Sequence, residues 1–82
     1  MSVQETSIEN QIRGYRLKLG DRIRLIREQR GYSQDQLAEM MNINRSTISK
    51  IENGKFSISV DYLARFSIFL DYEFRVIEKF KL

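Results

Sequence analysis

The stretch from Ser33 to Gly54 limits the folds open to this chain, because it predicts two short helices joined by a tight turn. Ser33 and Gln36 have the spacing of a capping box, in which each side chain accepts a hydrogen bond from the other residue's backbone N–H. The apolar residues that follow recur at helical spacing and form one stripe, Leu37, Ala38 and Met41. Asn42 then tolerates the left-handed backbone conformation that ends many helices.

The second helix of this pair is predicted to begin after Asn44, a good N-cap residue, and to end at Gly54. Ile48 and Ile51 form its inward, apolar side. Its other surfaces are polar or basic and carry Arg45, Ser46, Thr47, Ser49 and Lys50. Such a pair is typical of a helix-turn-helix, a DNA-binding motif whose second helix enters the major groove.

The same stretch resembles the XRE family, the lambda-repressor and Cro-like domains. The residues that carry the resemblance are Gln34, Leu37-Ala38, Ile43, Ser46-Thr47-Ile48-Ser49 and Ile51-Glu52-Asn53-Gly54-Lys55. The resemblance runs from about Leu19 to Leu70, and it implies a mostly α fold, a lambda-repressor-like bundle of four to five helices. Asn42 stands where the family usually has Gly, which is a conservative change because Asn also adopts positive φ.

Residues 1–82 are predicted to form a single domain, and its helical core is predicted over residues 18–70. Helix one is expected from about Lys18 to Arg30, and a break near Gly14 or Gly20 is allowed because each costs roughly 1 kcal/mol against Ala in a helix interior. Residues 1–10 are mostly polar and are expected to form a flexible arm. Ser59 is expected to cap the last helix, whose buried stripe is Leu63, Phe66 and either Phe69 or Leu70.

From Tyr72 onward apolar and charged residues alternate, which predicts a C-terminal β-strand over residues 72–82. A continuation of the preceding helix is the alternative, since Phe69, Glu73, Val76 or Ile77, and Phe80 also align at helical spacing. A lone strand leaves its backbone N–H and C=O groups open, so we expect it to pair with the same strand of a second chain in a homodimer. The side chains predicted to form this interface are Tyr72, Phe74, Val76 and Phe80.

The positive charge of the chain is concentrated around the motif. Residues 13–55 contain 10 basic and 5 acidic residues, whereas the whole chain has a net charge of +3. This distribution suits a polyanionic partner. The absence of Cys and His excludes catalysis by these residues and zinc sites built from them. Since no carboxylates cluster suitably, we expect no enzyme activity, no metal and no cofactor.

No stretch of the sequence is long and apolar enough to cross a membrane, and Met1 to Glu5 have no signal-peptide pattern. We therefore expect a cytoplasmic protein with no membrane partner. The sequence predicts specific binding to double-stranded DNA, with the protein acting as a transcriptional repressor on a palindromic operator. An interaction module that has lost DNA binding is disfavoured by the retained Arg45, Lys50 and Lys55.

Base reading is expected from Arg45, Ser46, Thr47 and Lys50, because a guanidinium can bond both major-groove acceptors of guanine and hydroxyl groups can donate to bases. Phosphate contacts are expected from Gln34, Asn44, Asn53 and Lys55. The resemblance also implies a structural ion pair between Arg27 and Glu52. The alternative function is that of an antitoxin of the HipB type, which binds a toxin protein and represses its own operon. Such antitoxins combine a similar helix-turn-helix domain with a C-terminal strand, and this chain resembles them in that order of elements.

Overall fold

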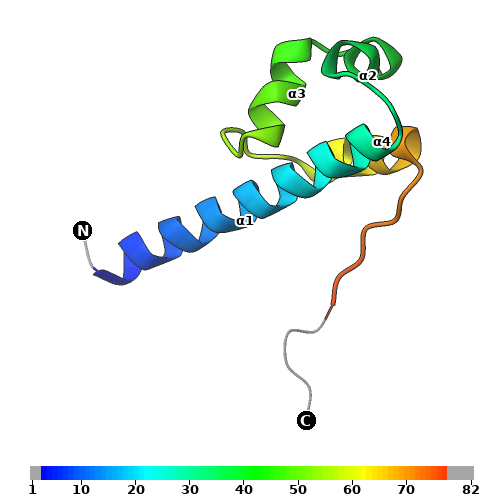
Figure 1. Ribbon diagram of the computed structural model, residues 1–82. Coiled ribbons are helices and arrows are strands. Elements are labelled where there is room, and N and C mark those ends of the chain that lie inside the picture. Colours follow the sequence, from blue (N-terminus) through cyan, green and yellow to red (C-terminus); the bar gives the residue numbers. More distant parts are fainter. Residues whose placement is uncertain (1–2, 78–82) are drawn as a thin grey trace.

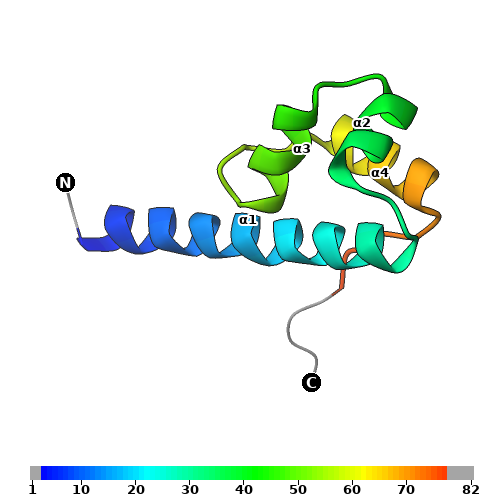
Figure 2. The same ribbon diagram turned by 45° about the horizontal axis from the view of Figure 1, so that its top comes forward.

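The computed structural model describes residues 3–77, which form four α-helices (Figure 1). The helices are α1 (Val3–Gln29), α2 (Gln34–Met41), α3 (Arg45–Glu52) and α4 (Val60–Leu70). α2, α3 and α4 gather around the C-terminal half of α1, and the N-terminal half of α1 projects beyond them (Figures 1 and 2). The predicted mostly α class is confirmed, with four helices over this part of the chain.

α1 is much longer than the sequence pattern predicted. It was expected to begin near Lys18, but it begins at Val3, so residues 3–10 are helical and the prediction of a flexible arm there is wrong. Residues 1–2 lie outside the described part. Good helix formers such as Gln4, Glu9 and Gln11 let a helix that starts in the packed half continue outward. The glycines within α1 lower its stability without interrupting it.

Gly20 lies where the C-terminal end of α3 crosses α1. A Cβ atom at this position would stand 2.7 Å from the carbonyl oxygen of Glu52 and would also collide with the carbonyl oxygen of Ile51. Because both obstacles are backbone atoms, they cannot move aside as a flexible side chain would. The missing side chain therefore allows α1 and α3 to approach closely.

The core lies between α2, α3, α4 and the C-terminal half of α1. Its buried apolar residues are Ile23, Leu37, Ala38, Met41, Ile48, Ile51, Leu63, Phe66 and Leu70. The structure resolves the alternative left open for α4, because Leu70 is fully buried whereas Phe69 is 38% exposed.

Local capping interactions match the sequence pattern at three helix ends. The backbone N–H of Gln36 donates to Ser33 Oγ at 3.0 Å, and the backbone N–H of Ser33 donates to Gln36 Oε1 at 2.8 Å, which completes the capping box of α2. Asn42 ends α2 with φ of 55°. Ser59 Oγ accepts the backbone N–H of Tyr62 at 3.1 Å at the start of α4.

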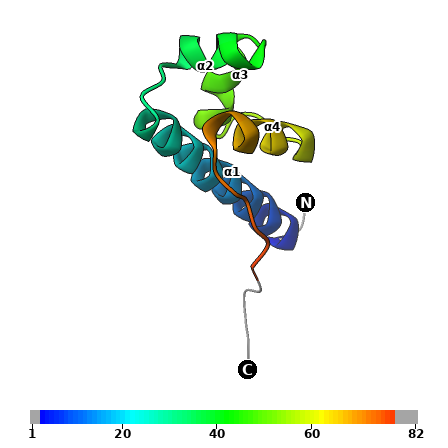
Figure 3. The same cartoon turned by 90° about the vertical axis from the view of Figure 1, so that its right-hand side faces the viewer.

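Residues 72–77 form neither the predicted strand nor the alternative helical continuation. Asp71 adopts the left-handed conformation with φ of 54° and ends α4, and the chain then runs back across α1 without regular secondary structure (Figure 3). A strand needs a partner for its backbone hydrogen bonds, and residues 3–77 provide none. The rest of the predicted strand, residues 78–82 with Phe80, lies outside the described part.

Alternate side chains of the C-terminal segment, Tyr72, Phe74 and Val76, nevertheless lie on the side of the segment that faces the same chain. Tyr72 packs against the chain's own core, and burial raises the pKa of its hydroxyl, which has no hydrogen-bond partner among the described residues. Phe74 and Val76 line an apolar groove of about 590 Å³ together with Ile12 and Tyr15 of α1. Of the predicted dimer contacts, Tyr72 and Phe74 thus lie against the same chain, whereas Val76, at the rim of the groove, is fully exposed. Within residues 3–77 no helix has the length and apolar character needed to span a membrane.

Candidate nucleic-acid interface

α3 has two distinct sides. Ile48, Ile51 and Glu52 are buried against the rest of the molecule. The residues predicted to read bases lie on the other surfaces, where Arg45, Ser46 and Lys50 are exposed and Thr47 is half-buried. α3 therefore presents a polar, basic surface outward while its apolar side holds it in place.

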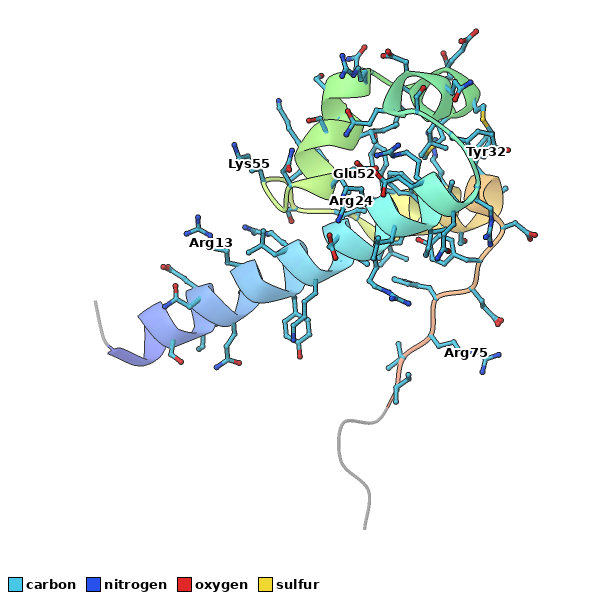
Figure 4. The ribbon with its side chains drawn as sticks, in the orientation of Figure 1. Arg13, Arg24, Tyr32, Glu52, Lys55 and Arg75 are labelled. Atoms are coloured by element: carbon cyan, nitrogen blue, oxygen red, sulfur yellow. The ribbon has the colours of Figure 1, made fainter. Side chains whose placement is uncertain are left out.

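The position of α3 is fixed by Glu52, at its last turn. Arg27 Nε lies 2.6 Å from Glu52 Oε2, and Arg27 Nη2 lies 3.0 Å from Glu52 Oε1, so the pair is bidentate. Both side chains are almost fully buried, with exposed fractions of 9% and 2%. Hydrogen bonding to Glu52 raises the pKa of Arg27, which keeps the guanidinium charged. The sequence resemblance implied this contact, and Glu52 lies between α1 and α3 in Figure 4.

Two further groups complete the arrangement around this pair. Arg27 Nη1 donates to the carbonyl oxygen of Tyr32 at 2.8 Å. Gln34 Nε2, at the first residue of α2, donates to Glu52 Oε1 at 2.9 Å. The carboxylate of Glu52 thus joins α1, α2 and α3, and it sets the angle at which α3 projects.

The four residues predicted to contact phosphates differ in how much of their hydrogen-bonding capacity is used internally. Gln34 bonds Glu52 as described, and Asn53 Nδ2 donates to the carbonyl oxygen of Ser49 at 2.9 Å. Asn44 occupies the N-cap position of α3 but makes no side-chain capping bond, and it is exposed. Lys55 is exposed and extends from the loop that follows α3 (Figure 4).

Asp35, in the first turn of α2, was not singled out by the sequence pattern. Its Oδ1 atom lies 3.5 Å from Arg45 Nε, and both side chains are exposed. An ion pair in water contributes little to stability. Arg45 is therefore held loosely at the start of α3 and can exchange this carboxylate for another acceptor.

Two arginines of α1 join the basic surface near Lys55. Arg13 and Arg16 line a groove together with Lys55, and Arg13 and Lys55 extend toward the same side of the molecule (Figure 4). The sequence analysis did not select Arg13 or Arg16 as DNA contacts, and only the excess of basic residues over 13–55 pointed to this region. Residues 3–77 contain no group of three or more acidic side chains that could hold a metal ion.

A family model described as helix-turn-helix matches residues 23–77 of the chain. The crystal structure of the restriction-modification controller protein C.AhdI from Aeromonas hydrophila is similar, with a TM-score of 0.70 and 30% sequence identity. This similarity covers 73% of the present chain and 91% of the controller protein.

Two curated proteins are similar in sequence over 52 residues. An HTH-type transcriptional regulatory protein of Pyrococcus furiosus is 36% identical, and the match covers 63% of this chain but 16% of the relative. The competence pilus inhibition repressor of Acinetobacter baylyi is 35% identical, and the match covers 60% of this chain and 47% of the relative. The similarity thus spans less than half the length of either relative.

Proposed function

The chain belongs to the XRE family of helix-turn-helix proteins, and from this premise we propose that it binds double-stranded DNA sequence-specifically and regulates transcription. Repression is the proposed mode, because one relative is named as a repressor. The observation that carries the proposal is the outward surface of α3. Its basic and hydroxyl side chains are exposed, while the buried pair of Arg27 and Glu52 holds the helix rigidly.

In the proposed mode, α3 lies in the major groove and Arg45 donates two guanidinium N–H bonds to the O6 and N7 acceptors of one guanine. Asp35 releases Arg45 at that point, since their exposed contact is weak. Ser46 and Thr47 donate to base or phosphate oxygens, and the Thr47 methyl group contacts thymine. Lys50, one turn further along, reaches a base or a phosphate.

Phosphates of the DNA backbone are the proposed partners of Gln34, Asn44, Asn53 and Lys55. The Gln34 amide has a second N–H that can donate to a phosphate oxygen beyond its bond to Glu52. Asn53 Nδ2 already contacts both the carbonyl oxygen and Oγ of Ser49, at 2.9 and 3.4 Å, and would exchange the longer contact for a phosphate oxygen. Asn44 and Lys55 are exposed at the two ends of α3. Contacts at both ends would fix the register of α3 on the duplex.

We further propose a homodimer on a palindromic operator. The support is the exposed apolar surface of the C-terminal segment, where Val76 is fully exposed and Ile77 is 82% exposed. Neighbouring exposed apolar side chains commonly mark protein contacts. A two-fold dimer would place two α3 helices on half-sites about 34 Å apart.

Val76→Asp tests the dimer by sedimentation velocity. The charge should shift the protein toward monomer without unfolding it, because the side chain is exposed. Val60→Asp is the matched control, since Val60 is also well exposed but lies on α4. A dimer that tolerates Val76→Asp as well as Val60→Asp would move the interface to another surface.

The structure gives little support to the alternative function as an antitoxin. It relied on a C-terminal strand after the helix-turn-helix core, and residues 72–77 form no strand. A toxin protein as a second partner would have to bind a surface that no feature of residues 3–77 identifies.

Selection from a pool of random DNA duplexes tests sequence-specific binding. We expect enrichment of one sequence that contains two inverted half-sites. Enrichment of no sequence over many rounds would contradict the proposal.

The enriched duplex then permits a test of the reading helix by fluorescence titration at several salt concentrations. Arg45→Ala should lose roughly 1–3 kcal/mol on that duplex and relax the preference at one base position. Lys55→Ala should weaken binding to the enriched and to random duplexes about equally and should flatten the salt dependence. Unchanged affinity of Arg45→Ala for the enriched duplex would show that α3 is placed wrongly.

A further inference from the structure

A polar groove of about 520 Å³ separates the N-terminal half of α1 from the residues that follow α3. Three cationic side chains line it, Arg13 and Arg16 from α1 and Lys55 from the opposite wall. Arg13 and Arg16 are three residues apart on a helix, so they lie on the same face. We call this feature the basic groove.

Gly54 brings the two walls of the basic groove together. Its φ of 70° is a conformation that side chains other than Gly rarely adopt. A Cβ atom at Gly54 would lie 2.8 Å from Leu17 Cδ2 of α1, so the glycine lets the loop rest directly on the helix. Lys55 follows immediately and lines the same groove as Arg13, on the same side of the molecule (Figure 4).

The cations of the basic groove differ from most arginines elsewhere in the chain. Among residues 7–77, whose side chains the structure describes, neither Arg13, Arg16 nor Lys55 forms an ion pair, whereas the arginines at positions 24, 27, 45 and 75 all do. Glu9 is the one described carboxylate that lines the groove. Three cations against one carboxylate leave a net positive charge there, and an anion would relieve their mutual repulsion.

We propose that the basic groove binds a phosphate of the DNA backbone next to the half-site that α3 reads, an inference that rests on the DNA-binding function proposed above. α3 has 8 residues and is therefore about 12 Å long, and in a helix-turn-helix the N-terminal residues of the second helix contact base edges in the major groove. A helix of this length in that groove places the residues beyond its end beside the flanking backbone. Lys55 lies three residues after the end of α3, and the basic groove continues outward from it.

The consequence is a longer DNA footprint than α3 and its loops provide. The helix-turn-helix family model begins at residue 23, so the α1 side of the basic groove lies outside the matched region. The projecting half of α1 thus becomes a second DNA-contacting element, which carries affinity but no sequence information because phosphates are common to all sequences.

The test uses the full chain and measures affinity for the enriched duplex and for a random duplex over a series of salt concentrations. The variant Arg13→Gln with Arg16→Gln removes two cations of the basic groove. The variant Lys18→Gln with Arg22→Gln is the matched control, because it removes the same charge from exposed positions on the same helix but outside the groove. Melting by circular dichroism checks that each variant is folded.

We expect the groove variant to bind both duplexes about tenfold more weakly at 0.1 M salt, with a salt dependence reduced by about two phosphate contacts. The control should change affinity much less. Glu9→Gln should tighten binding, since it removes the carboxylate that repels a phosphate. If the double variant proves unfolded, the single variants Arg13→Gln and Arg16→Gln probe the same wall, and each should show a smaller loss that is equal for both duplexes.

Equal behaviour of the groove variant and the control would overturn the inference. Arg45→Ala, measured in parallel, separates this failure from that of the proposed function. If Arg45→Ala loses the enriched duplex while the groove variant matches its control, α3 reads DNA and the basic groove binds none. If the wild-type chain selects and binds no duplex, both proposals fail together.

Discussion

The two halves of α1 belong to one unbroken helix but use their side chains differently. From Gly20 onward the helix packs against α3 and α4, with Ile23 fully buried and Arg27 paired with Glu52. Before Gly20, the apolar side chains of Ile8, Ile12, Tyr15 and Leu17 are exposed. The cations of this half have no ion pair with the described side chains of residues 7–77. One half thus stabilises the fold, whereas the other is largely exposed apart from the contact of Gly54 with Leu17 and the groove that Ile12 and Tyr15 share with Phe74.

The two glycines of α1 show the same contrast. A Cβ atom added at Gly14 would meet no atom within 4 Å, whereas one added at Gly20 would collide with two backbone carbonyl oxygens of α3. The same substitution should therefore have opposite effects in the two halves, which makes the comparison testable.

Gly20→Ala is expected to have the largest effect. The added methyl group would force α3 away from α1 and disturb the Arg27–Glu52 pair, so the free energy of unfolding should fall by about 5 kcal/mol or more. Chemical denaturation monitored by circular dichroism measures this loss. A variant as stable as the wild type would mean that α1 and α3 are further apart than described.

Glu52→Ala should rank second. It would leave the buried Arg27 guanidinium and the Gln34 amide without their acceptor, at a cost of about 3–5 kcal/mol. The melting temperature should fall in the absence of DNA. Glu28→Ala is a suitable control, because the pair of Glu28 with Arg24 is exposed and should contribute little. Equal melting temperatures for the two variants would contradict the structural role of Glu52.

Arg30→Ala should have a smaller effect on the packed side of the molecule. Arg30 Nε donates to the carbonyl oxygen of Leu70 at 2.7 Å, and Nη2 donates to that of Asp71 at 2.8 Å, so the side chain caps the end of α4. Loss of these partly exposed bonds should cost about 1 kcal/mol. Arg13→Ala, in the projecting half, should leave the unfolding free energy unchanged to within about 0.5 kcal/mol. A drop of similar size in both variants would remove the distinction between the two halves.

Gly14→Ala should have the smallest effect, and of opposite sign. Alanine has the higher helix propensity, and the position is open, so stability should rise by about 0.5–1 kcal/mol. Helix content from circular dichroism should rise with it. Destabilisation would indicate that the projecting half of α1 is packed more closely than described.

Local sequence determined the helix-turn-helix and its ends. The capping box of Ser33 and Gln36, the left-handed turn at Asn42 and the cap at Ser59 each depend on residues within three or four positions of one another. Such signals act at short range, so they can be recognised in the sequence. The apolar stripes of α2, α3 and α4 follow from helical periodicity in the same way.

Tertiary packing decided what lies beyond that range. Gly20 looked like a site for a break in α1, but α3 crosses the helix there. The residue of α3 that comes nearest, Ile51, lies 31 residues later in the chain. Gln34 was predicted only as a phosphate contact, and the structure adds a bond from its amide to Glu52. The C-terminal alternation predicted a strand, yet a strand exists only where another segment offers hydrogen bonds.

The sequence by itself determined the family, the motif and the chemical character of the α3 surface, because short-range periodicity and capping encode them. Only the tertiary structure decided the extent of α1, the three-helix junction at Glu52 and the proximity of Arg13 and Arg16 to Lys55. These depend on how segments distant in the chain pack together. About 40 residues separate the two walls of the basic groove, and no local pattern in the sequence records that they meet.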